Sequence, residues 1–67
     1  MRYIIGVDLG GTQLRAALAD EQGRLLDEVR MRTLVDDGPA AVIDRIVGCI
    51  EQVRATLPAG GMLAGIG

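Results

Sequence analysis

The stretch from Ile4 to Thr12 constrains the fold of this chain more than any other segment. It combines a β-branched run, a carboxylate at Asp8 and a Gly-Gly-Thr turn. A second apolar run begins at Leu14, so the glycine pair must reverse the chain as a tight hairpin between two strands. A carboxylate, bare backbone amides and a hydroxyl are therefore predicted to gather at one hairpin tip.

That hairpin tip has the chemistry of a phosphate-binding site. Because glycine lacks a Cβ, Gly10 and Gly11 are expected to adopt positive φ angles and to bring their amides close to a ligand. Turn amides form an anion-binding concavity, Thr12 adds a hydroxyl donor, and Asp8 is placed to hold a cation that offsets phosphate charge. Asp8 is also expected to be buried and to need a partner, which a metal would supply. An ordinary hairpin turn without any ligand remains the alternative.

The length and composition bound the class of protein. A chain of 67 residues makes at most one small domain, and such a domain buries only about 60% of its unfolded surface. The single cysteine excludes an internal disulfide, and the absence of histidine argues against a zinc site. Yet 49% of the residues are apolar, and the sequence stops at Gly67 within an apolar run. We therefore expect a fragment of a larger protein.

The charge pattern excludes several functions. The net charge is −2, the seven basic residues are all scattered arginines, and a nucleic-acid surface is therefore not expected. Without lysine there is no P-loop, and a strand rather than a helix follows the glycines, which excludes the dinucleotide fingerprint. No apolar run approaches the ~20 residues of a membrane span, and no signal peptide is recognisable. A cytoplasmic location is expected by default.

The apolar pattern predicts strands over residues 2–8, 13–20, 24–33 and 62–67 and a helix over residues 39–57. A strand, helix and strand in succession normally return parallel through a right-handed crossover. We therefore expect an α/β fold with a mixed sheet in the order 3-2-1-4. The first three strands should be antiparallel, and the fourth should lie parallel beside the first. The charge density of the third strand is typical of a sheet edge.

The helix should pack one broad apolar stripe on the sheet, with Asp44 and Arg45 among the polar residues opposite. Asp36 or Asp37 is expected to cap it, and Pro39 suits its first turn. One helix covers one face only, although the first strand has apolar side chains on both faces. The missing cover should come from further sequence or another chain. The expected stripe comprises Val42, Ile43, Ile46, Val47, Ile50, Val53 and Leu57.

Three single residues have more than one interpretation. Cys49, near the margin of the stripe, is expected to be a packed and inert thiol, because nothing nearby would generate a thiolate. Arg15 could point toward bound phosphate, but pairing with a carboxylate is favoured because the residue already lies along the strand. Gly6 is expected to mark the close approach of another element to the first strand.

The segment from Ile5 to Leu18, followed by Ala19-Asp20 and a turn at Gly23, resembles the first phosphate motif of the ROK family of repressors, open reading frames and sugar kinases. That family belongs with actin, hexokinase and the heat-shock chaperone ATPases. The resemblance covers essentially the whole chain. It implies that the predicted sheet and helix are part of a ribonuclease H-like, or actin-like ATPase, domain.

The resemblance further implies an ATP-dependent sugar kinase of the glucokinase type, using ATP and Mg²⁺. Asp8 would orient magnesium, directly or through water, and Gly10, Gly11 and Thr12 would hold the β- and γ-phosphates. Gln13 joins this cofactor-binding set at a position where many family members carry lysine. Phosphoryl transfer relies mainly on positioning and charge stabilisation. The catalytic aspartate, the sugar-binding residues, the adenine pocket and a zinc site come from later segments in the family.

No catalytic residue is therefore expected within these 67 residues, and the isolated chain is expected to be inactive. The implied partners are a nucleotide and a hexose, with a homodimer as the assembly and neither nucleic acid nor membrane bound. A sugar-sensing repressor is one alternative. If Met1 is the true start of the protein, no helix-turn-helix is expected before the first strand, and this would favour the kinase. A catalytically inactive sugar-binding protein and other ATPases of the superfamily are further alternatives.

Overall fold

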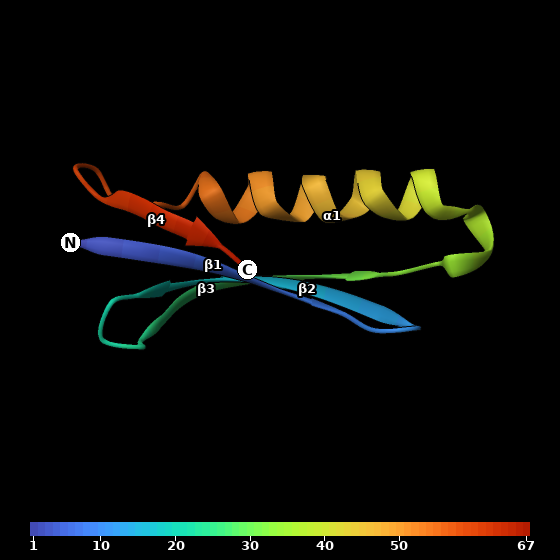
Figure 1. The fold of residues 1–67 in the computed structure, drawn as a ribbon, viewed down its shortest axis with the longest axis horizontal. Coiled ribbons are helices and arrows are strands. Elements are labelled where there is room, and N and C mark those ends of the chain that lie inside the picture. The colour runs from blue at the N-terminus through green and yellow to red at the C-terminus, as the bar shows by residue number, and fades with distance from the viewer.

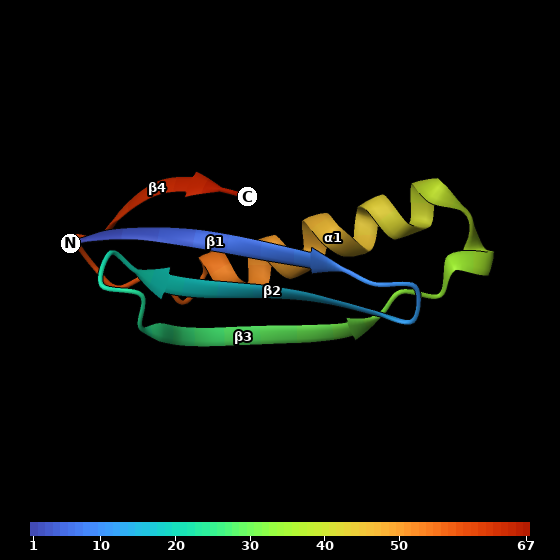
Figure 2. The same cartoon turned by 60° about the horizontal axis from the view of Figure 1, so that its bottom comes forward.

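The computed structural model describes residues 1–67 as a four-stranded sheet with one helix packed on one face (Figure 1). The strand order is β3-β2-β1-β4, with β1 antiparallel to β2, β2 antiparallel to β3, and β4 parallel to β1 (Figure 2). The predicted α/β class and the 3-2-1-4 order are confirmed. The elements are β1 (Arg2–Leu9), β2 (Gln13–Asp20), β3 (Leu25–Arg32), the short 3-10 helix η1 (Val35–Asp37), α1 (Pro39–Arg54) and β4 (Met62–Ile66).

Alternation along the strands decides which side chains form the core. Tyr3 and Ile5 of β1 and the even-numbered residues of β2 face α1, because successive strand residues point to opposite sides of the sheet. Cys49 and Val53 of α1 pack against them. The buried apolar core therefore lies entirely between α1 and the sheet, and comprises Tyr3, Ile5, Leu14, Ala16, Leu18, Cys49 and Val53.

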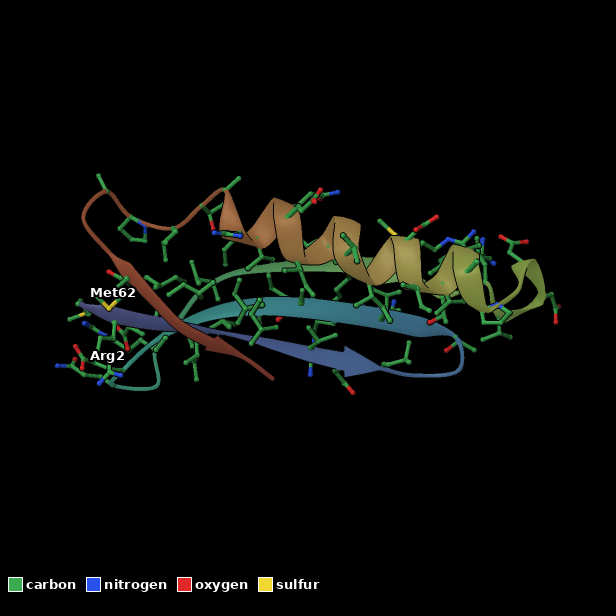
Figure 3. The ribbon with its side chains drawn as sticks, turned by 45° about the horizontal axis from the view of Figure 1, so that its top comes forward. Arg2 and Met62 are labelled. Carbon is green, nitrogen blue, oxygen red and sulfur yellow. The ribbon has the colours of Figure 1, made fainter.

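The sheet-facing stripe of α1 is narrower than the sequence predicts. Ile46 and Ile50 pack against the core, whereas Ile43 and Val47 are 58% and 46% exposed. Ile43 lies about 100° around the helix from Val42, and Val47 lies about 100° around it from Ile46. This rotation turns both exposed side chains away from the strands. Cys49, expected near the margin, is fully buried on the face toward the sheet. Figure 3 shows the side chains that fill the space between helix and sheet.

The start of α1 differs from the expected cap. Gly38, with φ of 96°, occupies the N-cap position, and no side chain accepts a hydrogen bond there. Pro39 follows in the first turn as predicted. Asp36 and Asp37 lie in η1 instead, so the prediction that one of them caps α1 is wrong. The carboxylate of Asp37 pairs with the guanidinium of Arg45, which draws η1 against the first turns of the helix.

The face of the sheet away from α1 is open. Ile4 is 51% exposed, so burial of β1 on both sides is not found within this chain, while the expectation that α1 covers a single face is confirmed. Gly6 also lies on the open face, and a Cβ built there would meet no atom within 4 Å. The close approach predicted at Gly6 is therefore absent from residues 1–67.

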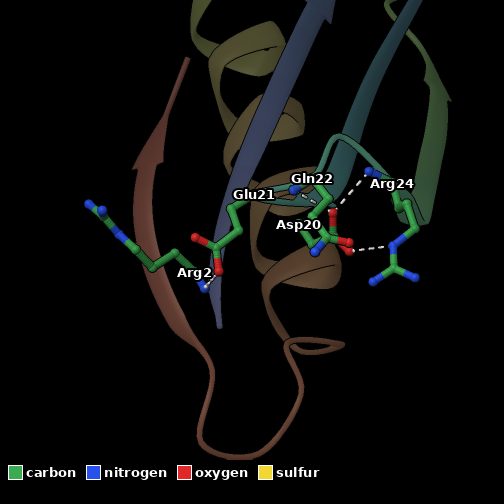
Figure 4. Close-up of polar contacts among 5 residues, drawn as sticks. All are labelled: Arg2, Asp20, Glu21, Gln22 and Arg24. Atoms are coloured by element: carbon green, nitrogen blue, oxygen red, sulfur yellow. Dashed lines mark hydrogen bonds and ion pairs between the residues drawn. The ribbon is translucent and has the colours of Figure 1, made fainter.

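The β2–β3 turn is fastened by one carboxylate (Figure 4). Asp20 is only 3% exposed and accepts hydrogen bonds from the amides of Gln22 and Arg24 at 2.9 and 3.0 Å and from the Arg24 Nε at 2.9 Å. These bonds, led by the Arg24 amide, hold the pKa of Asp20 below its ordinary value, against the desolvation that raises it. The sequence pattern predicts a polar turn here, but it does not predict that the aspartate of this turn is buried.

Candidate functional site

The β1–β2 hairpin closes through Gly10, whose amide donates a 2.9 Å hydrogen bond to the carbonyl of Gln13. Neither Gly10 nor Gly11 has a positive φ, so the expectation that these glycines adopt positive φ angles is wrong. A Cβ on Gly10 would lie 2.9 Å from the Gln13 oxygen, whereas one on Gly11 would meet nothing within 4 Å. Close approach of the two backbones, rather than a left-handed conformation, therefore requires glycine at position 10.

Thr33, directly after β3, fastens the hairpin from the side. Its hydroxyl donates a 2.8 Å hydrogen bond to the Gly10 carbonyl, and its amide donates a 3.0 Å hydrogen bond to the Thr12 carbonyl. Thr33 is 1% exposed, so the donor of both bonds is shielded from water, although Gly10 and Thr12 themselves are exposed. Figure 2 shows the β1–β2 turn lying beside the segment that joins β3 to α1. The Gly10 and Thr12 carbonyls of the turn are thereby occupied.

Arg45 extends this connection into the helix. One of its guanidinium nitrogens donates to the carbonyls of Thr33 at 2.8 Å and Leu34 at 3.3 Å, and the other pairs with Asp37. Leu34 has a left-handed backbone conformation, with φ of 53°, where the chain turns from β3 into η1. A continuous set of hydrogen bonds therefore runs from α1 through Thr33 to the hairpin.

The amides of Gly11 and Thr12 are left without partners. Neither donates to a backbone or side-chain acceptor, and both residues are exposed at the tip. Backbone N–H groups are obligatory donors, so two successive unpartnered amides must be satisfied by water or by a ligand. Adjacent turn amides of this kind form a concavity suited to an anion, and the Thr12 hydroxyl lies beside them in the sequence.

Asp8 is exposed, and not buried as the sequence suggested. Its side chain is 72% accessible, and it forms a 3.4 Å ion pair with the guanidinium of Arg15, its cross-strand partner. The expectation that Arg15 pairs with a carboxylate is confirmed. An exposed pair at this distance is worth at most about 1 kcal/mol, so it can be exchanged for a stronger partner. The Asp8 carboxylate is thus accessible to a cation.

The predicted site residues fall into two groups around the hairpin. Asp8 and Gln13 line a hollow of about 150 Å³ with Arg15 and Arg30, whereas Gly11 and Thr12 line a second hollow of about 200 Å³. Gly10 lines neither and supports the turn between them. The full linings are Asp8, Gln13, Leu14, Arg15 and Arg30 for the first hollow, and Gly11, Thr12, Arg32, Leu34, Val35 and Asp36 for the second.

No group of three or more histidine, cysteine or carboxylate residues gathers anywhere in the chain. A metal at Asp8 would therefore depend on phosphate oxygens and water for most of its ligands. Cys49 takes no part: burial raises the pKa of its thiol, and it is fully enclosed, in agreement with the inert thiol expected from the sequence.

Sequence reasoning missed Thr33 and Arg45. A threonine after a charged strand carries no motif, and an arginine on the polar side of a helix usually faces solvent. Both become visible only when β3 and α1 are brought against the hairpin. The one sequence signal in this region is that the alternating strand pattern ends at residue 33, several residues before the helical pattern begins.

Comparison with known proteins adds an independent observation. Over 50 residues, or 75% of the chain, the sequence is 46% identical to the glucokinase of Thermotoga maritima. The similarity is to glucokinases. Over 54 residues, or 81% of the chain, it is 37% identical to the glucokinases of Streptomyces coelicolor and Streptomyces lividans. The chain spans about a sixth of the length of these glucokinases, since each match covers 16% of the relative.

No family model matches the chain. The glucokinase similarity therefore rests on pairwise comparison and extends over three quarters or more of these 67 residues. The single helix of the structure is neither long nor apolar enough to cross a membrane. The fold is consistent with part of an actin-like ATPase domain.

Proposed function

We propose that this chain is the phosphate-binding part of an ATP-dependent sugar kinase of the glucose type, and that the longer protein transfers the γ-phosphoryl group of ATP to a hexose hydroxyl. The observation that carries the proposal is the pair of unpartnered amides at Gly11 and Thr12, on a hairpin whose Gly10 and Thr12 carbonyls are already occupied. The similarity to glucokinases supports the same conclusion and suggests the substrate class.

In this proposal the hairpin binds the β- and γ-phosphates. The amides of Gly11 and Thr12 and the Thr12 hydroxyl donate hydrogen bonds, and Gln13 contributes its side-chain amide from the start of β2. Gly10 acts through its backbone, since its own amide is already used within the turn. Donors held in place before the ligand arrives need little reorganisation during phosphoryl transfer, which is the contribution expected of such a site.

Asp8 is the residue that would hold Mg²⁺. Magnesium prefers one or two carboxylates together with phosphate oxygens and water, and a single exposed carboxylate next to a phosphate-binding turn fits that preference. The ion would neutralise phosphate charge during transfer. Asp8 would exchange its weak pairing with Arg15 for the stronger interaction with the ion or with a water bound to it.

The remaining functions are assigned to parts of the longer protein outside this chain. These are the base that accepts the proton of the sugar hydroxyl, the hexose and adenine sites, a zinc site and the surface of a homodimer. The 67 residues alone should therefore show no glucose-dependent ATP turnover. A membrane or nucleic-acid partner forms no part of the proposal.

The test is a coupled assay of the longer protein with ATP, Mg²⁺ and a panel of hexoses. Hexose-dependent turnover is expected, and Asp8→Asn should lower kcat/KM about a hundredfold by removing the carboxylate at the metal. Asp44→Asn, which removes an exposed, unpaired helix carboxylate, is the matched control and should stay within about twofold. Hexose binding without turnover would instead indicate a sensor or an inactive sugar-binding protein, and no binding of either substrate would overturn the proposal.

A further inference from the structure

The phosphate-binding hairpin lacks a cation at the position next to the turn. The chain contains no lysine, and Gln13, the first residue of β2, is neutral. Neutral amide and hydroxyl donors bind phosphate without the added attraction between opposite charges that a guanidinium or ammonium donor supplies. A nucleoside triphosphate carries several negative charges, so a positive side chain from another element is expected to contact it.

Arg32 is the residue that the sheet places there. In the β2–β3 register Arg32 is the direct partner of Gln13, and paired residues present their side chains on the same face, with Cβ atoms about 4.5–5.5 Å apart. Arg32 also lines the 200 Å³ hollow that contains Gly11 and Thr12. A long side chain on β3 therefore reaches the same space as the two unpartnered amides.

The other arginines near the hairpin already have partners. Arg15 pairs with Asp8, Arg30 pairs with Glu28, and Arg45 pairs with Asp37. Arg32 is exposed and forms neither an ion pair nor a side-chain hydrogen bond, although the carboxylate of Asp36 lines the same hollow. Its guanidinium is thus a free cation beside a set of free amide donors.

We propose that Arg32 binds the terminal phosphates of the nucleotide and supplies the positive charge that Gln13 lacks. This inference rests on the proposed function, because it assigns one more ligand-binding residue to the same hairpin. The guanidinium would donate to phosphate oxygens from the β3 side, while the Gly11 and Thr12 amides donate from the turn. Arg32 is a binding residue in this scheme, and no bond is made or broken at it.

The test is nucleotide binding to the longer protein, measured by calorimetry for ATP, ADP and AMP with Arg32→Gln. The variant should bind ATP about tenfold more weakly or worse, ADP less affected, and AMP nearly unchanged, because a charge-assisted bond is lost only where the terminal phosphates lie. Arg54→Gln is the matched control. It removes an exposed arginine with no ion pair at the far end of α1, and all three affinities should stay within about twofold.

A second experiment restores the positive charge from the neighbouring strand β2. Gln13→Lys combined with Arg32→Gln should recover most of the lost ATP affinity, since the two residues are cross-strand partners with their side chains on the same face of the sheet. Gln13→Lys alone should tighten ATP binding by less than about threefold if Arg32 already supplies the charge. A tenfold gain from that single variant would overturn the inference, and this measurement remains available even if Arg32→Gln fails to fold.

The outcomes also separate this inference from the function on which it depends. If the unaltered protein binds no ATP, the proposed function fails and the role of Arg32 fails with it. If the unaltered protein binds ATP and the Arg32→Gln and Arg54→Gln variants bind it equally well, the inference alone is wrong. An equal loss for ATP, ADP and AMP would indicate a structural effect and would also contradict it.

Discussion

The hydroxyl of Thr33 donates a 2.8 Å hydrogen bond to the carbonyl of Gly10, which ties the end of β3 to the turn between β1 and β2. The two residues are 23 positions apart in the chain. Because the Thr33 amide also holds the Thr12 carbonyl, one buried residue fixes the geometry of the candidate phosphate-binding turn. The turn is therefore supported by tertiary structure and not by its own sequence alone.

Replacing Thr33 by valine should loosen the turn. The substitution keeps the shape but leaves the Gly10 carbonyl without its shielded donor, which costs about 1–3 kcal/mol in the free energy of unfolding. The KM for ATP should rise, because the Gly11 and Thr12 amides lose their fixed position. Thermal unfolding and steady-state kinetics of the longer protein measure the two effects. Thr56→Val, which removes an exposed hydroxyl bonded to Val53 O at 2.7 Å, should leave both nearly unchanged.

Replacing Gly61 by alanine should destabilise the protein through the core. A Cβ at this position would lie 2.5 Å from Cε2 of the largely buried Tyr3 ring, so the ring or the backbone must move at a cost of about 1–3 kcal/mol. Gly48→Ala is the control in α1, where a Cβ meets nothing within 4 Å and alanine should stabilise the helix by about 0.5–1 kcal/mol. Equal melting temperatures for the two variants would contradict this packing.

Asp20 should make stability depend on pH in the acid range. Hydrogen bonds from the Arg24 amide, its guanidinium and the Gln22 amide lower the pKa of Asp20 in the folded state. A depressed carboxyl pKa stabilises the fold above the unfolded value of about 3.9, and this contribution is lost as the pH falls through the folded value. Melting temperatures from pH 7 to pH 2 should therefore fall less steeply for Asp20→Asn than for the unaltered protein. Asp44→Asn should retain the steep fall.

Cys49 should resist thiol reagents in the folded protein. It is fully buried between α1 and the sheet, and burial raises its pKa, so little accessible thiolate forms. Labelling by a disulfide reagent should be slow in buffer and fast in denaturant, as followed by mass spectrometry of the peptide that contains Cys49. Rapid labelling under native conditions would show that α1 separates from the sheet.

The sequence predicts the order of strands because its signals are local and agree with one another. Apolar runs, the glycine turn and the single helical stretch before Met62 leave few arrangements of four strands with a right-handed crossover. The apolar run before Asp8 also predicts that this carboxylate is buried, but Asp8 is exposed because α1 covers only the opposite face of the sheet. Whether a strand residue is buried depends on which elements cover its face of the sheet. The sequence of one strand alone does not show this.

The candidate site also combines residues that the local sequence identifies with residues whose roles depend on tertiary contacts. The glycines and Thr12 are recognisable from their order, but the role of Gly10 depends on its distance to the Gln13 carbonyl. Thr33 and Arg45 reach the turn only through the register of β2 with β3 and the packing of α1. The local sequence favours helix capping by Asp36 or Asp37, but in the structure Asp37 pairs with Arg45 and neither aspartate caps α1.

The two margins of the sheet are chemically unequal. β3 carries a row of charged side chains, which discourages a further strand from joining it, whereas β4 presents the uncharged sequence Met62–Ile66 on its outer side. Any widening of the sheet is thus directed past β4. The hairpin that holds Gly11 and Thr12 is anchored on the β3 side, so additional strands could be accommodated without altering the place where the nucleotide would bind.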